Sequence, residues 1–324
     1  MQYSSNFLKI FIAILLIAVA VIAILYSWDK SGKVQENPYQ YDIDRFKNIR
    51  AELIKYEESQ QIKIELKTPY AVAVDRDDKI YVAGDSTLLI YNNEGHAVSH
   101  IALNEEVKCI AVGPDNLIYL GLVNHIEVYE KSGQKISTWK YLNNKAIITS
   151  IAATENDIFI ADAGNKVVLR YNLSGTLLRR IGEKDEAKDI PGFVVPSPYF
   201  DLAIGYEGYL WVVNPGRHAL ENYTFSGELR SSWERSSMDI EGFSGCCNPT
   251  HIAMLANGSF VTSEKGLVRV KIHNQMGNFK EVVAGPKYFA EDAVGLDLAV
   301  DSIGRILVLD PKAGVVRIFT KKQN

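Results

Sequence analysis

Two adjacent cysteines and a nearby histidine are the residues of this chain best suited to chemistry. Cys246 and Cys247 lie in a linker, and His251 follows four residues after the second cysteine. Adjacent thiols can close a strained ring, bind a soft metal as thiolates, or stay reduced and packed. An imidazole at this spacing would add a third ligand. Two interpretations stand: a structural linker, with or without a vicinal disulfide, and a redox or metal site.

His251 also belongs to a second candidate group, which follows from a repeated pattern. It stands two residues before an alanine in a short apolar run, and Asp201 and Asp297 hold the same place in two other runs. If these runs are neighbouring strands, one imidazole lies between two carboxylates, an arrangement suited to acid–base chemistry or a divalent metal. The alternative is a hydrogen-bonded polar cluster in the core. The six residues at this place are Ala71, Cys109, Ser150, Asp201, His251 and Asp297.

A third group comes from the ends of the second apolar runs. Oxygen donors at the mouth of a central channel could hold a cation between successive repeats. The alternative is that each aspartate makes a local turn bond. The polar residues at this place include Asp162, Asn214 and Asp310, and the full set is Gly84, Leu122, Asp162, Asn214, Ser263 and Asp310.

These groups depend on a sequence unit that recurs six times. Each unit has an apolar run around an alanine, a turn rich in Asp, Asn or Gly, a second run of β-branched and aromatic residues, and further strand signals. The units follow one another at about 40 to 50 residues, a spacing typical of propeller blades. The central alanines are Ala73, Ala111, Ala152, Ala203, Ala253 and Ala299.

The third unit, residues 156–171, is similar to the repeats of the NHL family of six-bladed propellers. The family's glycine–phenylalanine–proline linker also occurs twice, at residues 192–198 and 242–249. The resemblance covers roughly residues 68–319 and implies an all-β, six-bladed β-propeller, a fold that carries many unrelated functions. Propeller lyases that cut amidated peptides place zinc-binding histidines one position before the residues of the second group. This chain has Tyr70, Lys108, Thr149, Phe200, Thr250 and Leu296 there, which argues against that activity.

The ring must be closed, because the last unit shows only about three strands. Residues 61–66 alternate apolar and charged side chains, as an outer strand does. We therefore expect them to pair with the blade made by residues 291–319, which would remove an exposed sheet edge.

The N-terminus carries an uninterrupted apolar run from Ile10 to Tyr26. About twenty such residues match a bilayer core, so we predict a tail at 1–6, a single uncleaved transmembrane signal anchor at 7–28, a stalk at 29–60 and the propeller at 61–324. A cleaved signal peptide and a buried core helix are the alternatives. The anchor would place the propeller in the periplasm or outside the cell.

The charge balance is mild: 35 Lys and Arg against 39 Asp and Glu give a net charge of −4. Nucleic acid is therefore not an expected partner, and we expect a monomeric propeller. Two functions stand. One is a membrane-tethered module that binds a protein, peptide or glycan through the long linkers 182–198 and 234–249. The other is a metal-dependent or redox enzyme that uses a divalent metal or the thiols near His251.

Overall fold

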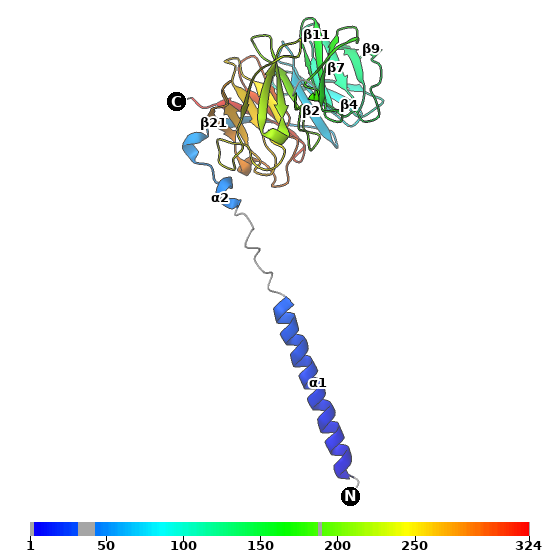
Figure 1. Ribbon diagram of the computed structural model, residues 1–324, viewed down its shortest axis with the longest axis vertical. Coiled ribbons are helices and arrows are strands. Elements are labelled where there is room, and N and C mark those ends of the chain that lie inside the picture. The colour runs from blue at the N-terminus through cyan, green and yellow to red at the C-terminus, as the bar shows by residue number, and fades with distance from the viewer. Residues whose placement is uncertain (1–2, 32–42, 187–189, 324) are drawn as a thin grey trace. The chain divides into compact units, whose positions relative to one another are not determined.

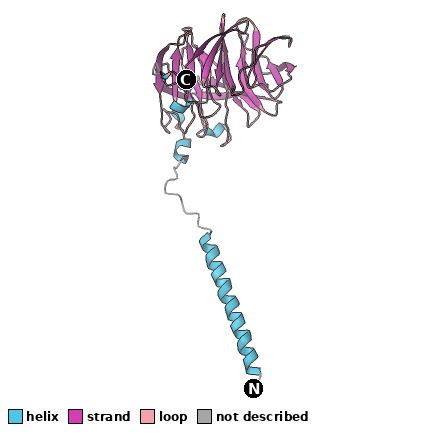
Figure 2. Ribbon diagram, turned by 45° about the vertical axis from the view of Figure 1, so that its right-hand side comes forward, coloured by secondary structure: helices cyan, strands magenta, loops and turns pink. Residues whose placement is uncertain are grey.

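The computed structural model describes residues 3–31, 43–186 and 190–323, and the chain divides into a unit of residues 1–43 and a unit of residues 44–324. In its described part, the larger unit consists of six four-stranded antiparallel sheets (Figure 1, Figure 2). The innermost strand of each sheet contacts that of the next, and the sixth contacts the first. The six-bladed β-propeller predicted from the repeats is confirmed.

Each blade runs from an inner strand at the ring centre to an outer strand at its rim. The inner strands of blades one to six are β2 (Pro69–Val74), β6 (Cys109–Val112), β10 (Ile148–Ala153), β14 (Leu202–Ile204), β18 (His251–Met254) and β22 (Leu298–Val300). The second strands are β3 (Ile80–Gly84), β7 (Leu117–Gly121), β11 (Asp157–Asp162), β15 (Leu210–Asn214), β19 (Phe260–Ser263) and β23 (Ile306–Asp310). The third strands are β4 (Thr87–Tyr91), β8 (Ile126–Glu130), β12 (Val167–Asn172), β16 (Ala219–Tyr223), β20 (Val270–His273) and β24 (Val315–Lys321). The outer strands are β5 (Ala97–Ala102), β9 (Lys135–Thr138), β13 (Leu177–Ile181), β17 (Leu229–Glu234), β21 (Phe279–Ala284) and, for the sixth blade, β1 (Tyr56–Lys63).

Burial explains the composition of these strands. The second strands lie inside the blade stack, and every residue of β11, β15 and β23 is buried. Such strands take continuous runs of Val, Ile, Leu and aromatic residues because neighbouring blades cover both faces. The outer strands face water, and four of the five residues of β13 are exposed.

The ring closes through β1, as expected. β1 pairs antiparallel with β24, with Ile62 opposite Val316. The strand begins at Tyr56 and ends at Lys63, so it lies earlier than residues 61–66 and starts within the segment expected to be a stalk. Beyond it, the N–H of Ile64 still donates to the carbonyl of Gly314 at 2.9 Å.

The N-terminal unit contains the helix α1 (Tyr3–Ser31). The side chains of residues 9–25 are described, and all are exposed. Among the residues that the structure describes, no helix combines the length and apolar character needed to cross a membrane. The anchor at 7–28 stays a prediction. The predicted tail and stalk lie partly outside the described residues, which do not include 1–2 and 32–42.

Short helices occupy the connections of the larger unit. They are α2 (Asp44–Lys47), η1 (Ala51–Leu53), η3 (Pro215–Arg217) and η4 (Pro286–Tyr288).

Candidate functional site

The inner strands meet around a small polar cavity of about 90 Å³ at the centre of the ring. Five of the six residues that stand two places before the repeat alanines line it, because they lie at or near the start of the inner strands: Cys109, Ser150, Asp201, His251 and Asp297. The structure thus places these five residues together around the cavity.

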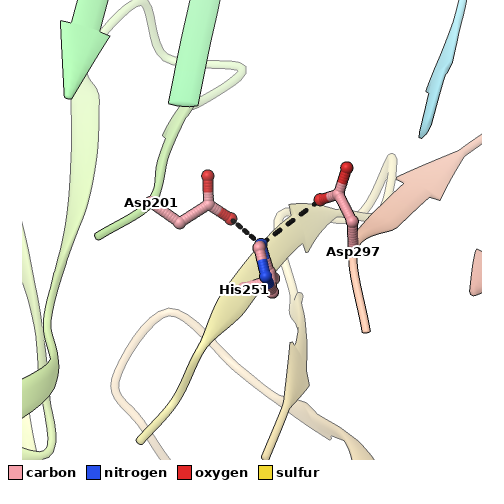
Figure 3. A group of neighbouring side chains, drawn as sticks. All are labelled: Asp201, His251 and Asp297. Atoms are coloured by element: carbon pink, nitrogen blue, oxygen red, sulfur yellow. Dashed lines mark ion pairs between the residues drawn. The ribbon is translucent and has the colours of Figure 1, made fainter. Parts of the chain in front are cut away.

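His251 lies between the two carboxylates (Figure 3). Its Nδ1 is 3.3 Å from Oδ1 of Asp297 and 3.7 Å from Oδ2 of Asp201. One potential ligand atom from each residue lies within 4.8 Å of the other two. The structure thus brings together three residues from blades four, five and six that are about fifty positions apart in the sequence.

Both carboxylates also tie neighbouring blades together. Oδ2 of Asp201 accepts the N–H of Ile252 in the next blade at 2.7 Å, and Oδ1 accepts the N–H of Leu202 at 2.8 Å. Oδ2 of Asp297 accepts the N–H of Val72 at 2.8 Å. These bonds hold the inner strands in place. They therefore support the interpretation of this group as a hydrogen-bonded polar cluster, whatever else the carboxylates do.

The charges of the site perturb its titration. Burial raises the pKa of Asp201 to about 6, with His251 lowering it and Asp297 raising it. Burial lowers the pKa of His251, but the hydrogen bond and charge of Asp297 and the charge of Asp201 outweigh it, so that this pKa is raised overall. Burial, with the negative charges of Asp297 and Asp201, also holds the pKa of the Cys109 thiol well above its ordinary value.

Cys246 and Cys247 lie elsewhere, in the loop between β17 and β18. Both are free, Cys246 is exposed, Cys247 is buried, and their Sγ atoms are 3.1 Å apart. Asn248 fixes the loop: its Nδ2 donates to the carbonyls of Ser244 and Lys265. In the described part of the chain, the group of three or more metal-type ligands contains His251 and the two aspartates but neither cysteine. The structure thus joins His251 to the carboxylates and leaves the thiols as a separate pair.

The residues of the third group, Asp162, Asn214 and Asp310, are all buried. Oδ1 of Asp162 accepts the N–H groups of Ile147 and Asn165, and Oδ1 of Asp310 accepts that of Ala313. Asn214 joins the N–H of Val194 to the side chain of Glu221. The two aspartates therefore make the local turn bonds that were the alternative interpretation of this group, whereas Asn214 joins segments further apart in the sequence.

The structure also has a surface groove, and none of the candidate site residues predicted from the sequence lines it. A groove of about 940 Å³ runs beside β13, between blades three and four, and residues 182–186 and 190–192 line one side of it. Its location agrees with the linker 182–198 expected to carry recognition. The groove could have been located from two adjacent leucines on an outer strand, Leu177 and Leu178, which are both exposed.

A buried ionic group supports the other long linker. Glu264 pairs with Arg269, Nε to Oε2 at 2.5 Å, and with Lys271, Nζ to Oε2 at 3.3 Å, and all three are at most 1% exposed. Arg269 also donates to the carbonyl of Met238, and Lys271 donates to the carbonyls of Ile240 and Gly242. Arg269, directly before β20, and Lys271 within it thereby hold the loop before the cysteines.

No family model matches the sequence, and no curated protein matches it. Its fold resembles many solved structures. A streptogramin B lyase matches with a TM-score of 0.56 at 11% identity, over 82% of this chain and 98% of the lyase. Virginiamycin B lyase from Staphylococcus aureus matches with a TM-score of 0.59 at 14% identity, over 82% and 100%. A protein of unknown function from Bacteroides thetaiotaomicron matches with a TM-score of 0.60 at 14% identity, over 82% and 72%.

At these identities the likeness concerns the fold alone. The protein is a six-bladed β-propeller, structurally like virginiamycin B lyase and NHL-type propellers.

Proposed function

We propose that the protein is a membrane-tethered binding propeller that holds an extended segment of a partner protein in the groove beside β13. The groove itself carries this proposal. Its volume of about 940 Å³ is at the upper end of the range for small-molecule pockets, which suits a polypeptide segment better than a compact ligand.

The lining of the groove favours a polypeptide. Leu177, Leu178 and Leu229 offer exposed apolar surface, with exposed fractions of 44, 49 and 56%. Charges of both signs lie among them, and Arg180 is paired with Glu183 at 2.9 Å. Mixed charge does not attract a polyanion, whereas apolar side chains beside paired charges match the surface of a protein.

The strand β13 offers the means of binding. It is the end strand of the order β10-β11-β12-β13, so an extended segment can add to its outer edge through backbone hydrogen bonds. Asp185 and Ile190, which both line the groove, exchange two backbone hydrogen bonds of 3.0 and 2.9 Å. Arg179 donates from β13 to the carbonyl of Ser226 in blade four at 2.8 Å, which holds the two blades together.

The tether rests on the N-terminal sequence. A helix that is apolar all round is unstable in water, and the described apolar side chains of α1, such as Ile10 and Leu16, are about two-thirds exposed, at 60 and 64%. We propose that lipid covers them and that the propeller faces the periplasm or the cell exterior. The full chain should then stay with membranes after alkaline carbonate extraction, and a chain without residues 1–43 should be released. Release of both would contradict the tether.

Site-specific photo-crosslinking in native membranes tests the groove. A crosslinker at Leu178, the second residue of β13, should trap one protein, and Leu229→Asp across the groove should abolish the adduct. The matched control is Val98, which is the second residue of the outer strand β5 and is also exposed, at 57%. An adduct of equal yield at Val98, or one that survives Leu229→Asp, would reject the groove as the binding site.

A second candidate function is metal-dependent chemistry in the central cavity. The observation that favours it is the convergence of Asp201, His251 and Asp297 on one point that a cavity adjoins. An enzyme of this kind requires a bound ion with an open position.

A further inference from the structure

We propose that Asp201, His251 and Asp297 bind one divalent transition-metal ion of the zinc class at the centre of the ring. The second candidate function rests on this ion site, whereas the ion site does not require catalysis.

The separations between the three side chains are the first argument. Nδ1 of His251 carries at most one proton, so it can donate to only one carboxylate. A charge-assisted hydrogen bond is about 2.7–2.9 Å long. The distances from Nδ1 of His251 to the carboxylate oxygens of Asp297 and Asp201 are longer, at 3.3 and 3.7 Å. Ligand atoms that share a tetrahedral ion through bonds of about 2.0–2.2 Å lie about 3.3–3.6 Å apart. The separation of His251 from Asp297 falls in this range and that from Asp201 lies just above it, so both carboxylates lie close to co-ligand distance from the imidazole.

The support around the carboxylates is the second argument. Each carboxylate accepts two backbone N–H groups: Asp201 from Leu202 and Ile252, and Asp297 from Leu298 and Val72. Metal-binding carboxylates are typically held by such outer hydrogen bonds, which fix their direction before the ion arrives. The ligands here come from three separate blades of a closed ring, so the site is formed by the fold rather than by a flexible loop.

Charge and space are the third argument. Two carboxylates face one imidazole where Asp201 is buried and His251 and Asp297 are half-buried, and a divalent cation would compensate the excess negative charge. The adjoining cavity of about 90 Å³ has room for water at an open coordination position. Cys109, a free thiol that is 5% exposed, lines the same cavity from blade two.

The donor set selects the ion. Calcium takes six to eight oxygen ligands, and magnesium keeps several waters in an octahedron of oxygens. One imidazole nitrogen and two carboxylate oxygens suit zinc and its neighbours in the first transition row. A site built only from the thiols would instead favour softer ions, and those thiols lie outside this group.

The test is titration of the full chain in detergent with Zn²⁺, after treatment with a chelator, followed by elemental analysis of the dialysed protein. We expect one ion per chain. His251→Ala should weaken binding by at least about 100-fold, since loss of a direct ligand should cost no less than loss of an outer-shell partner. This variant leaves the backbone bonds of both aspartates in place, so the propeller should keep its fold, which a thermal melt without metal verifies.

Two further variants separate the alternatives. Asp297→Asn keeps an oxygen for one of the two backbone N–H groups but loses the charge, and should weaken binding at least tenfold, again by the outer-shell comparison. Cys247→Ser is the matched control, with unchanged binding expected. Co²⁺ as a spectroscopic probe should give the visible bands of a tetrahedral nitrogen–oxygen site without sulfur charge-transfer absorption.

The proposal is overturned if the chain binds no Zn²⁺, if His251→Ala binds as the wild type does, or if Cys247→Ser abolishes binding. Bound zinc lost in His251→Ala, with no turnover of any substrate, would reject the enzyme and keep the ion site.

Discussion

The carboxylate of Asp297 accepts a hydrogen bond of 2.8 Å from the backbone N–H of Val72, a residue 225 positions earlier in the chain. Val72 belongs to the first blade, and Asp297 directly precedes the inner strand of the sixth. The ring is therefore closed twice: at the rim by β1 beside β24, and at the axis by this bond. The equivalent bond from Ile252 to Asp201 shows that the same device also joins blades four and five.

Asp297→Ala should destabilise the propeller by about 2–4 kcal/mol, because it leaves the N–H groups of Val72 and Leu298 without their acceptor in a buried position. Asp297→Asn should cost about half of this, since the amide oxygen still accepts one of the two N–H groups while the amide nitrogen cannot accept the other. Urea denaturation followed by tryptophan fluorescence measures both values. Equal losses in the two variants would contradict an acceptor role. The comparison is made with chelator present, so that bound metal does not contribute.

The outer closure makes its own prediction. A chain that begins at residue 44 keeps β1 and should unfold in one cooperative transition, whereas a chain that begins at residue 64 exposes the edge of β24 and should aggregate or lose cooperativity. Calorimetry and light scattering distinguish the two outcomes. If the shorter chain stays monomeric and melts at the same temperature, β1 is dispensable.

Much of this architecture could be predicted from the sequence because it depends on local signals. The residues predicted at the ends of the second apolar runs, from Gly84 to Asp310, lie at the last residue of the second strand or one residue beyond it. The strand β1 was located less well, because Tyr56–Gln60 is polar and charged and takes its place only through pairing with β24. Its bounds therefore depend on a partner about 260 residues away.

The candidate site was predictable in part for a related reason. A fixed place in each repeat faces the axis, which was sufficient to place Asp201, His251 and Asp297 together. The cysteines are next to His251 in sequence, but β18 begins at His251 and turns its side chain to the axis, while Cys246 and Cys247 remain in the loop. For the groove beside β13 the sequence offered only the long linker 182–198 and the adjacent leucines Leu177 and Leu178, because the hollow itself depends on how blades three and four pack.

Glu264 should be among the most sensitive positions in the protein. Glu264→Gln leaves Arg269 and Lys271 buried without a counter-charge, and removing one partner from such a group costs about 3–5 kcal/mol. The double variant Glu264→Gln with Lys271→Met should recover part of this loss, because one buried cation fewer remains. Chemical denaturation of the single and double variants provides the measurement. A double variant less stable than the single one would show that charge balance is not the cause.

The thiols should differ sharply in reactivity. Cys246 is exposed, while Cys247 and Cys109 are 2 and 5% exposed, so alkylation of the native protein should label Cys246 alone and denaturation should reveal three thiols. Because the two adjacent Sγ atoms are in contact, oxidised glutathione should convert the pair to a disulfide, releasing two reduced glutathione molecules per chain. Mass spectrometry should then show the loss of two hydrogens. Cys246→Ser is the control and should show no such loss, and three persistent thiols in the wild type would reject the vicinal disulfide.

His273 should make the propeller sensitive to acid. Burial, together with the charge of Lys271, lowers its pKa to about 3, and its Nε2 lies 3.2 Å from the carbonyl of Glu241 in the loop before the cysteines. Below an ordinary pKa of about 6.5 the unfolded chain takes up a proton that the folded protein does not, so stability falls as the pH drops from 6.5 towards 3.

This single group should cost roughly 3 kcal/mol between pH 6.5 and pH 4, at 1.36 kcal/mol for each pKa unit. His273→Gln and His273→Leu remove the titrating group. In each variant the free energy of unfolding should therefore fall by roughly 3 kcal/mol less than in the wild type over this pH range, whatever the stability of the variant at pH 7. Urea denaturation at half-unit steps of pH gives the slopes. The carboxylates of the protein titrate equally in all three proteins, so their contribution cancels when the curve of a variant is subtracted from that of the wild type. Parallel curves for the wild type and both variants would show that His273 takes up its proton in the folded protein as readily as in the unfolded chain.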